Sequence, residues 1–312
     1  MSHYESEGYH HPHAPEGDLD LSRILDGWEY KHGEVNTRRI QSHEGQTLIQ
    51  MRVAMGVLQM QEDGRPDGMR PHGFDSYLEF FEHELKKYYS AHVKVDGFHL
   101  TGDDCDELRQ EAHLFYLRYL CFFRLEDYAR AARDTARNLR VLDLMMHYAE
   151  EEEDRLSMQQ YRPYIMMMNA RARSSLAMKT ANLVEAVRIL EEASEGIKNF
   201  YRAMENEFEG LEADALIESS EELTVLSELI NTVNEESTQS AKPMAVSEQP
   251  IPMNNPEVEE EEQTLPTSVI DGLKQELQQA VDAEEYVKAA SLRDRIRAME
   301  KVVHKHHGGV HG

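Results

Sequence analysis

Four arginines that recur every three or four residues form the first candidate site, because this spacing places them on one face of a helix: Arg130, Arg133, Arg137 and Arg140. Such a face could hold an acidic partner protein, the chain's own glutamate-rich stretch or nucleic-acid phosphates. Exposed ion pairs contribute little free energy each. The simpler interpretation is a solvated helix face, partly balanced by Asp134 and Asp143.

A second candidate is the loop from Gly64 to Gly73, which carries side chains of types used in catalysis: Arg65, Asp67, Arg70 and His72. The same loop is rich in turn formers, so a rigid turn set by Pro66 and Gly68 is the simpler interpretation. No nucleophile–base pair, phosphate-binding loop or carboxylate pair stands out in the sequence. We therefore expect a protein that is not an enzyme and that uses no cofactor.

Histidines near both ends are the third candidate: His10, His11, His13, His304, His306 and His307. No Cys or carboxylate lies near them at the spacing of a structural metal site, so we expect adventitious binding and no dedicated metal site. The two cysteines, Cys105 and Cys121, form no CxxC pair. A disulfide framework is therefore not expected, which suits a reducing cytosol.

Charge and hydropathy narrow the class of protein. The chain has 312 residues, a formal net charge of −26 and a pI near 5.0. An acidic surface repels phosphate backbones, so nucleic-acid binding by the whole chain is not expected. The first residues have neither a basic start nor an apolar core, and no run reaches the roughly 18 apolar residues that span a bilayer. We expect a cytoplasmic protein without a membrane segment.

The elements that would position these side chains are mainly helical. We expect a His-rich disordered tail (1–17), a module with a β-hairpin packed with helices (18–100) and a helical repeat-like scaffold (101–233). An acidic disordered linker (234–268), a helical hairpin (269–303) and a His/Gly tail (304–312) follow. The linker is rich in Ser, Pro, Gln and Glu, and it therefore cannot bury enough apolar surface to fold.

In the module, two strands are expected on either side of a turn at residues 42–46. One strand would bury the alternating residues Ile49, Met51, Val53, Met55 and Val57, with Gly56 marking a bulge. A helix follows, capped by Asp75 or Ser76.

In the scaffold, the helix with the arginines has an opposite, apolar face made of Tyr128, Ala132, Thr135, Leu139, Leu142 and Met146. A second helix pair is expected from about residue 164 to 201.

The C-terminal part contains two apolar stripes that a turn at residues 282–285 would fold into an antiparallel hairpin. Leu273, Leu277, Ala280 and Val281 make one stripe, and Tyr286, Ala289, Leu292, Ile296 and Met299 make the other. Two helices this short are marginal alone in water. The hairpin is therefore expected to dock onto another protein or onto a second copy of itself.

The residues of this hairpin resemble the UVR motif, which the excision-repair proteins UvrB and UvrC share with the chaperone ClpC and its regulator McsA. The match rests on Leu273, Lys274, Leu277, Ala280, Tyr286, Ala289, Ala290, Leu292, Arg293, Asp294 and Ile296. The resemblance implies pairing with another such hairpin, with Arg293 and Asp294 at the polar margin. All of these residues except Lys274 form the predicted partner-binding set.

Two scaffold segments also resemble the tetratricopeptide repeat, one through Leu125, Asp127, Tyr128 and Ala131, the other through Asn182, Leu183 and Ala186. Their separation does not fit the repeat's period of about 34 residues. Helical hairpins with longer helices are therefore expected, not a regular array. The whole arrangement resembles bacterial proteins that carry a UVR motif.

These observations favour a non-enzymatic adaptor that binds a partner protein through its C-terminal hairpin. The motif serves both excision repair and Clp-type protein quality control, so both pathways stay open, as does self-association. The alternative is a DNA-damage-response protein that contacts nucleic acid through the arginine face.

Overall fold

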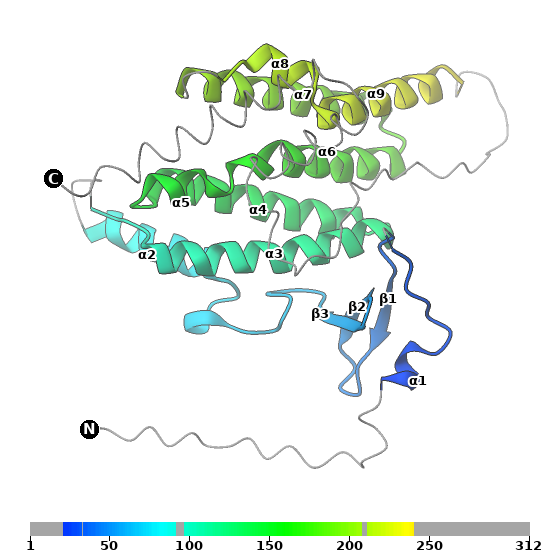
Figure 1. The fold of residues 1–312 in the computed structure, drawn as a ribbon. Coiled ribbons are helices and arrows are strands. Elements are labelled where there is room, and N and C mark those ends of the chain that lie inside the picture. Colours follow the sequence, from blue (N-terminus) through cyan, green and yellow to red (C-terminus); the bar gives the residue numbers. More distant parts are fainter. Residues whose placement is uncertain (1–20, 33, 92–96, 208–210, 240–312) are drawn as a thin grey trace, which may run out of the picture.

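The computed structural model describes residues 21–239 except 33, 92–96 and 208–210 (Figure 1). The predicted tails, the predicted UVR hairpin at residues 269–303 and most of the predicted linker lie outside the described residues.

The described chain is mainly helical with one small antiparallel sheet, as the sequence predicts. Its elements are α1 (Ser22–Leu25), β1 (Thr37–Gln41), β2 (Thr47–Val53), β3 (Gly56–Gln61), a 3₁₀ turn (Pro71–Gly73), α2 (Tyr77–Ala91), α3 (Gly102–Arg124), α4 (Tyr128–Tyr148), α5 (Glu152–Ser157), a second 3₁₀ turn (Gln159–Tyr161), α6 (Arg162–Lys179), α7 (Leu183–Glu207), α8 (Ala213–Glu218) and α9 (Glu221–Gln239). Every described helix is too short or too polar to cross a lipid bilayer.

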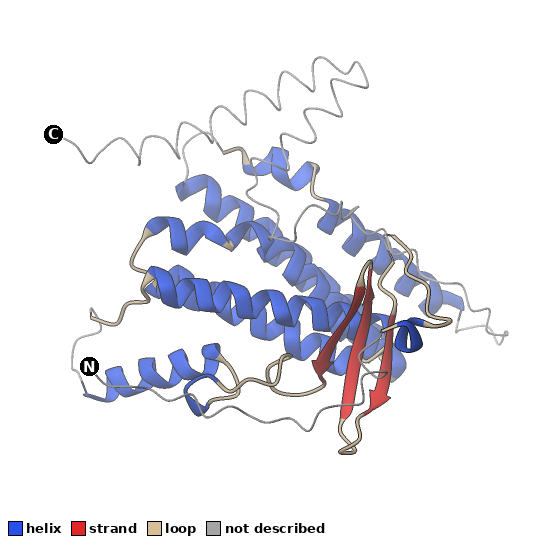
Figure 2. Cartoon of the chain, turned by 60° about the horizontal axis from the view of Figure 1, so that its bottom comes forward, coloured by secondary structure: helices blue, strands red, loops and turns tan. Residues whose placement is uncertain are grey.

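The sheet has three strands in the order β1-β2-β3, where the sequence pattern predicted two. The chain reverses at Ala54 and Met55, and Gly56 pairs with Val53 as the first residue of β3, so it does not form a bulge. This reversal breaks the predicted alternation. Ile49 is fully buried, whereas Met55 is 94% exposed at the turn. Figure 2 shows the sheet beside one end of the long helices.

Ile49 and Met60 anchor the sheet to the helices. Both side chains are buried in one apolar cluster with Cys121 and Phe122 of α3 and Ala131 of α4. The sheet therefore lies directly against the pair of helices that carries the predicted arginine face.

The long helices α3, α4, α6, α7 and α9 form a stack in which each packs against the next along the chain. Figure 1 shows α9 running back along α7 at the far side of the stack from the sheet. Leu190 and Ile197 of α7 share a buried cluster with Leu226 and Val233 of α9. The helix α9 continues to Gln239, beyond residue 233, where the scaffold was predicted to end.

The turns of the two hairpins α3–α4 and α6–α7 have the same backbone geometry. Glu126 and Ala181 both adopt the left-handed conformation, with φ of 54° and 56°. In each turn the next residue caps the following helix, because the Asp127 side chain accepts a hydrogen bond from the Arg130 amide and the Asn182 side chain accepts one from the Glu185 amide. The relation of these hairpins to tetratricopeptide repeats stays a prediction.

Candidate interaction sites

All four arginines of the predicted face contact carboxylates of the chain itself. Arg130 and Arg133 pair with Asp63, which follows β3. Arg137 pairs with Glu111 of α3, and Arg140 pairs with Glu82 of α2. The arginine face of α4 therefore contacts two other parts of the chain: Arg130 and Arg133 contact the loop after the sheet, and Arg140 contacts the helix α2.

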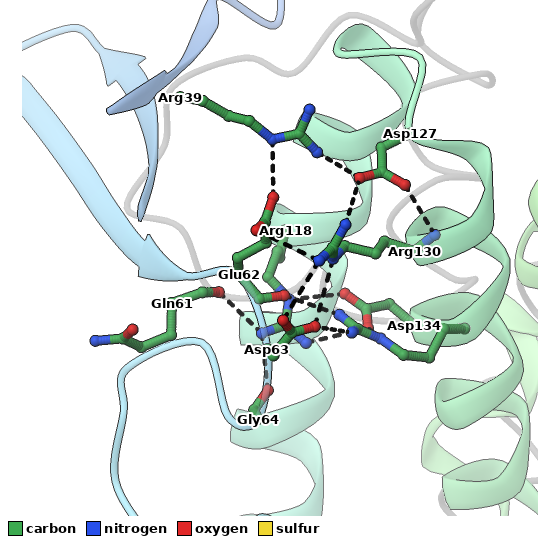
Figure 3. Close-up of polar contacts among 10 residues, drawn as sticks. Arg39, Gln61, Glu62, Asp63, Gly64, Arg118, Asp127, Arg130 and Asp134 are labelled. Carbon is green, nitrogen blue, oxygen red and sulfur yellow. Dashed lines mark hydrogen bonds and ion pairs between the residues drawn. The ribbon is translucent and has the colours of Figure 1, made fainter. Parts of the chain in front are cut away.

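At the centre lies a buried ion pair between Arg118 of α3 and Asp134 of α4, both fully buried (Figure 3). The Arg118 guanidinium donates to both Asp134 carboxylate oxygens, at 2.7 and 3.0 Å. Its remaining nitrogen donates to the carbonyls of Gln61 and Gly64, at 3.0 and 2.7 Å. One side chain thus joins α3, α4 and the end of β3.

Further ion pairs surround this centre (Figure 3). Arg39 of β1 pairs with Glu62 and with Asp127, the cap of α4. We call the whole set the charged junction: Arg39, Glu62, Asp63, Arg118, Asp127, Arg130, Arg133 and Asp134. A hydrogen bond from Arg130 holds the pKa of Asp63 below its usual value, with Arg133 adding to the effect. Burial alone would raise the pKa of Asp127, but hydrogen bonds from Arg130 outweigh it and lower that pKa.

Glu111 forms a second polar centre, fully buried beneath the start of α2. Its carboxylate accepts hydrogen bonds from the amides of Tyr77 and Leu78, at 2.7 and 3.2 Å. It also pairs with Arg137 and lies 3.7 Å from the guanidinium of Arg65. The negative charge therefore lies at the positive end of the α2 dipole, while Ser76 caps the same helix through the Glu79 amide.

The prediction that the arginines lie on a solvated helix face is wrong for Arg137, whose side chain is buried and only 8% exposed. Asp134 pairs with Arg133 as predicted, but Asp143 instead pairs with Arg162 of α6. The physical reason is that α4 is covered on two sides, by α3 and by α6. A single apolar stripe in the sequence indicated only one of these contacts.

Arg118 was missed by the sequence analysis. A lone arginine inside the apolar run Leu114–Phe123 was the signal that could have indicated it. A charge in such a run must be buried when the helix packs on both sides, and a buried charge requires a partner.

The loop Gly64–Gly73 borders a hollow of about 250 Å³. Its charged side chains pair with one another or with neighbours: Arg65 with Asp67 at 3.1 Å and Arg70 with Asp75 at 2.7 Å. The His72 ring stacks on Phe80 at 4.1 Å. Gly64 and Gly68 have φ of 68° and 77°, values that a side chain would strain.

Cysteines and acidic clusters offer no metal site in the part of the chain that the structure describes. The predicted His-rich tails lie outside it. Cys105 and Cys121 are free and buried, and burial raises their thiol pKa to about 12 and about 11. Neither thiol is therefore a thiolate at neutral pH.

Comparison with known proteins finds one similarity. Residues 267–302 match the family model described as the UvrB/uvrC motif. This segment includes the whole predicted partner-binding set, from Leu273 to Ile296. No curated protein and no solved structure gives a significant match. The C-terminal part of the chain therefore carries a UvrB/UvrC motif.

Proposed function

We propose that this chain is a non-enzymatic adaptor, in which the helical core is a scaffold and the UvrB/UvrC motif binds a partner protein. The observation that carries the proposal is the motif match at residues 267–302. In UvrB/UvrC-like proteins this motif mediates protein–protein interaction. The apolar residues Leu292 and Ile296 would lie in the contact with the partner, because short amphipathic helices need a second surface to bury such side chains.

The described core supports a scaffold role. The charged side chains that first suggested chemistry are engaged in ion pairs within the chain: Arg65 with Asp67 inside the loop, Arg130 of α4 with Asp63 after the sheet, and Arg137 of α4 with Glu111 of α3. Such pairs position segments of the chain relative to one another.

The alternative function, nucleic-acid binding through the arginine face, has weaker support. Binding phosphates would require Arg130, Arg133 and Arg140 to give up carboxylates that they already contact. Arg137 is buried and would not reach a phosphate.

The test is capture of partner proteins by the full chain carrying Leu292→Asp together with Ile296→Asp. The expected result is loss of capture, because two carboxylates in an apolar contact cost several kcal/mol of binding free energy. Mass spectrometry would identify the proteins that only the unchanged chain retains, and circular dichroism would check that the helical core is intact.

Ser291→Asp together with Ala298→Asp is the matched control. It adds the same charge, but at helical positions outside the apolar row. The control is expected to capture the same partners as the unchanged chain. Equal capture by the Leu292→Asp/Ile296→Asp chain would refute the proposal.

A further inference from the structure

The last two long helices of the stack form an open groove on their outer side. The groove has a volume of about 440 Å³ and is lined by Glu191, Ser194, Glu195, Lys198, Leu223, Ser227 and Ile230. Leu223 and Ile230 are half-buried, and they supply apolar surface between α7 and α9. The helix α6 packs against α7 and also contacts α9.

The lining residues have the spacing of a surface that receives a helix. On α7, Glu191, Ser194 and Lys198 follow at steps of three and four, and on α9 so do Leu223, Ser227 and Ile230. Val184 and Val187 continue the α7 row at the same steps, outside the lining of the groove. Residues at this spacing form the holes into which a neighbouring helix inserts its side chains. Val184 is 82% exposed at one end of this row, which is unusual for a valine in a packed helix.

The α7 wall of the groove carries two glutamates, Glu191 and Glu195, with Lys198 beside them. Glu195 also pairs with Arg202 at 3.3 Å. The α9 wall is made of Leu223, Ser227 and Ile230, and the helix α9 contains neither lysine nor arginine. An occupant of this groove therefore needs an apolar row with basic residues beside it.

Residues 286–303 of this chain have that pattern. Ala289, Leu292, Ile296, Met299 and Val303 follow at steps of three, four, three and four. In a helix, Lys288 and Arg295 would flank this row on one side and Arg293 on the other. Such a basic stretch is notable in a chain whose net charge is −26.

The connection along the chain permits this contact. The predicted linker contributes about 29 residues between the end of α9 and the predicted hairpin at residue 269, and a flexible chain of that length spans roughly 27–32 Å on average. A 19-residue helix such as α9 is about 28 Å long. Tethering of this kind gives an effective concentration in the millimolar range, which favours docking within one molecule.

We propose that residues 286–303 dock as a helix into the groove between α7 and α9 of the same chain. Leu292 and Ile296 would pack against Leu223 and Ile230. Arg293 and Arg295 would flank this contact, and Glu191 and Glu195 are the glutamates that line the groove. Docking would mask the apolar row that binds the partner, so the partner must displace it. This inference rests on the proposed function, because it describes how the same segment is regulated.

Hydrogen exchange of the full chain tests the proposal, with Glu191→Lys together with Glu195→Lys as the variant. Exposed pairs contribute up to about 1 kcal/mol each, so two reversals should speed exchange within residues 286–303 about tenfold. Partner capture should rise at the same time. Exchange of the α7 amides in the same experiment reports whether the core remains folded.

Two further variants separate the outcomes. Glu152→Lys together with Glu153→Lys makes the same charge change on exposed residues of α5 and should leave exchange of residues 286–303 unchanged. Adding Arg293→Glu and Arg295→Glu to the groove variant should restore protection, because the charges are then exchanged between the two surfaces.

The docking proposal is overturned if residues 286–303 exchange at the same rate in the unchanged chain and in the groove variant. Protection that grows with protein concentration would also overturn it, since a second copy would then be the occupant. Neither result affects the capture experiment with Leu292→Asp and Ile296→Asp. That capture experiment alone decides the proposed function, whereas hydrogen exchange decides the docking proposal.

Discussion

The two sides of the helical stack are held together by different forces. On the side of the sheet, α3 and α4 meet β3 through the charged junction, centred on the fully buried pair Arg118–Asp134. On the far side, α7 and α9 meet through apolar side chains such as Leu190, Ile197 and Leu226.

The difference has a consequence for specificity. A buried guanidinium accepts few arrangements, because each of its donors needs an acceptor, and Arg118 satisfies this need with Asp134 and the carbonyls of Gln61 and Gly64. The charged junction therefore fixes where the loop after β3 lies. Apolar contacts are less directional, so α7 and α9 can leave an outer groove available for another helix.

The largest expected effect on stability comes from Asp134→Ala, which removes the acidic partner at the centre of the charged junction. It leaves the Arg118 charge buried without its partner, and we expect a loss of about 3–5 kcal/mol in the free energy of unfolding. Denaturant titration followed by circular dichroism measures it. Asp143→Ala on the same helix is the control, because the Asp143 side chain is 56% exposed and pairs with Arg162 at the surface. Similar losses for both variants would contradict a structural role for the buried pair.

On the apolar side, Leu226→Ala should lower the free energy of unfolding by about 3 kcal/mol, through lost burial and a cavity between α7 and α9. This loss should be the same at low and high salt. Leu176→Ala, at a position 43% exposed on α6, is the control and should cost far less. A strong salt dependence of the Leu226→Ala effect would argue against an apolar contact.

The smallest effect is expected at the rim of the charged junction. The hydrogen bond from Arg130 lowers the pKa of Asp63 in the folded state. The ionised Asp63 carboxylate therefore stabilises the fold at pH values above the pKa that Asp63 has in the unfolded chain. This stabilisation is lost as the pH falls through the pKa of Asp63 in the folded chain. Asp63 is largely exposed, so Asp63→Asn should cost only about 0.5–1 kcal/mol at neutral pH.

Thermal unfolding at several pH values checks this prediction. The unchanged chain and the Asp63→Asn chain should begin to converge in stability as pH falls below the unfolded pKa of an aspartate, and they should become equal below the lowered folded pKa of Asp63. A constant difference between the two chains at every pH would show that the ionised carboxylate is not the cause.

Local signals in the sequence predicted much of the helical part. Ser76, one of the two residues predicted to cap the helix after the loop, does cap it through the Glu79 amide. The mainly helical class follows from short-range spacing and the UvrB/UvrC motif from a resemblance to a known motif, and both are confirmed. The three-stranded sheet was not predicted, because the turn at Ala54 and Met55 lacks the glycine or asparagine that usually marks a hairpin.

The sequence by itself determined the helical periodicity, the caps and the apolar row of residues 286–303, because these depend on neighbours within a few positions along the chain. Only the tertiary structure decided which charges are buried. Arg137 and Arg140 look alike in the sequence, yet Arg137 is buried against Glu111 and Arg140 is 54% exposed. The burial of a side chain depends on which helices pack around it, and that packing joins residues far apart in the sequence.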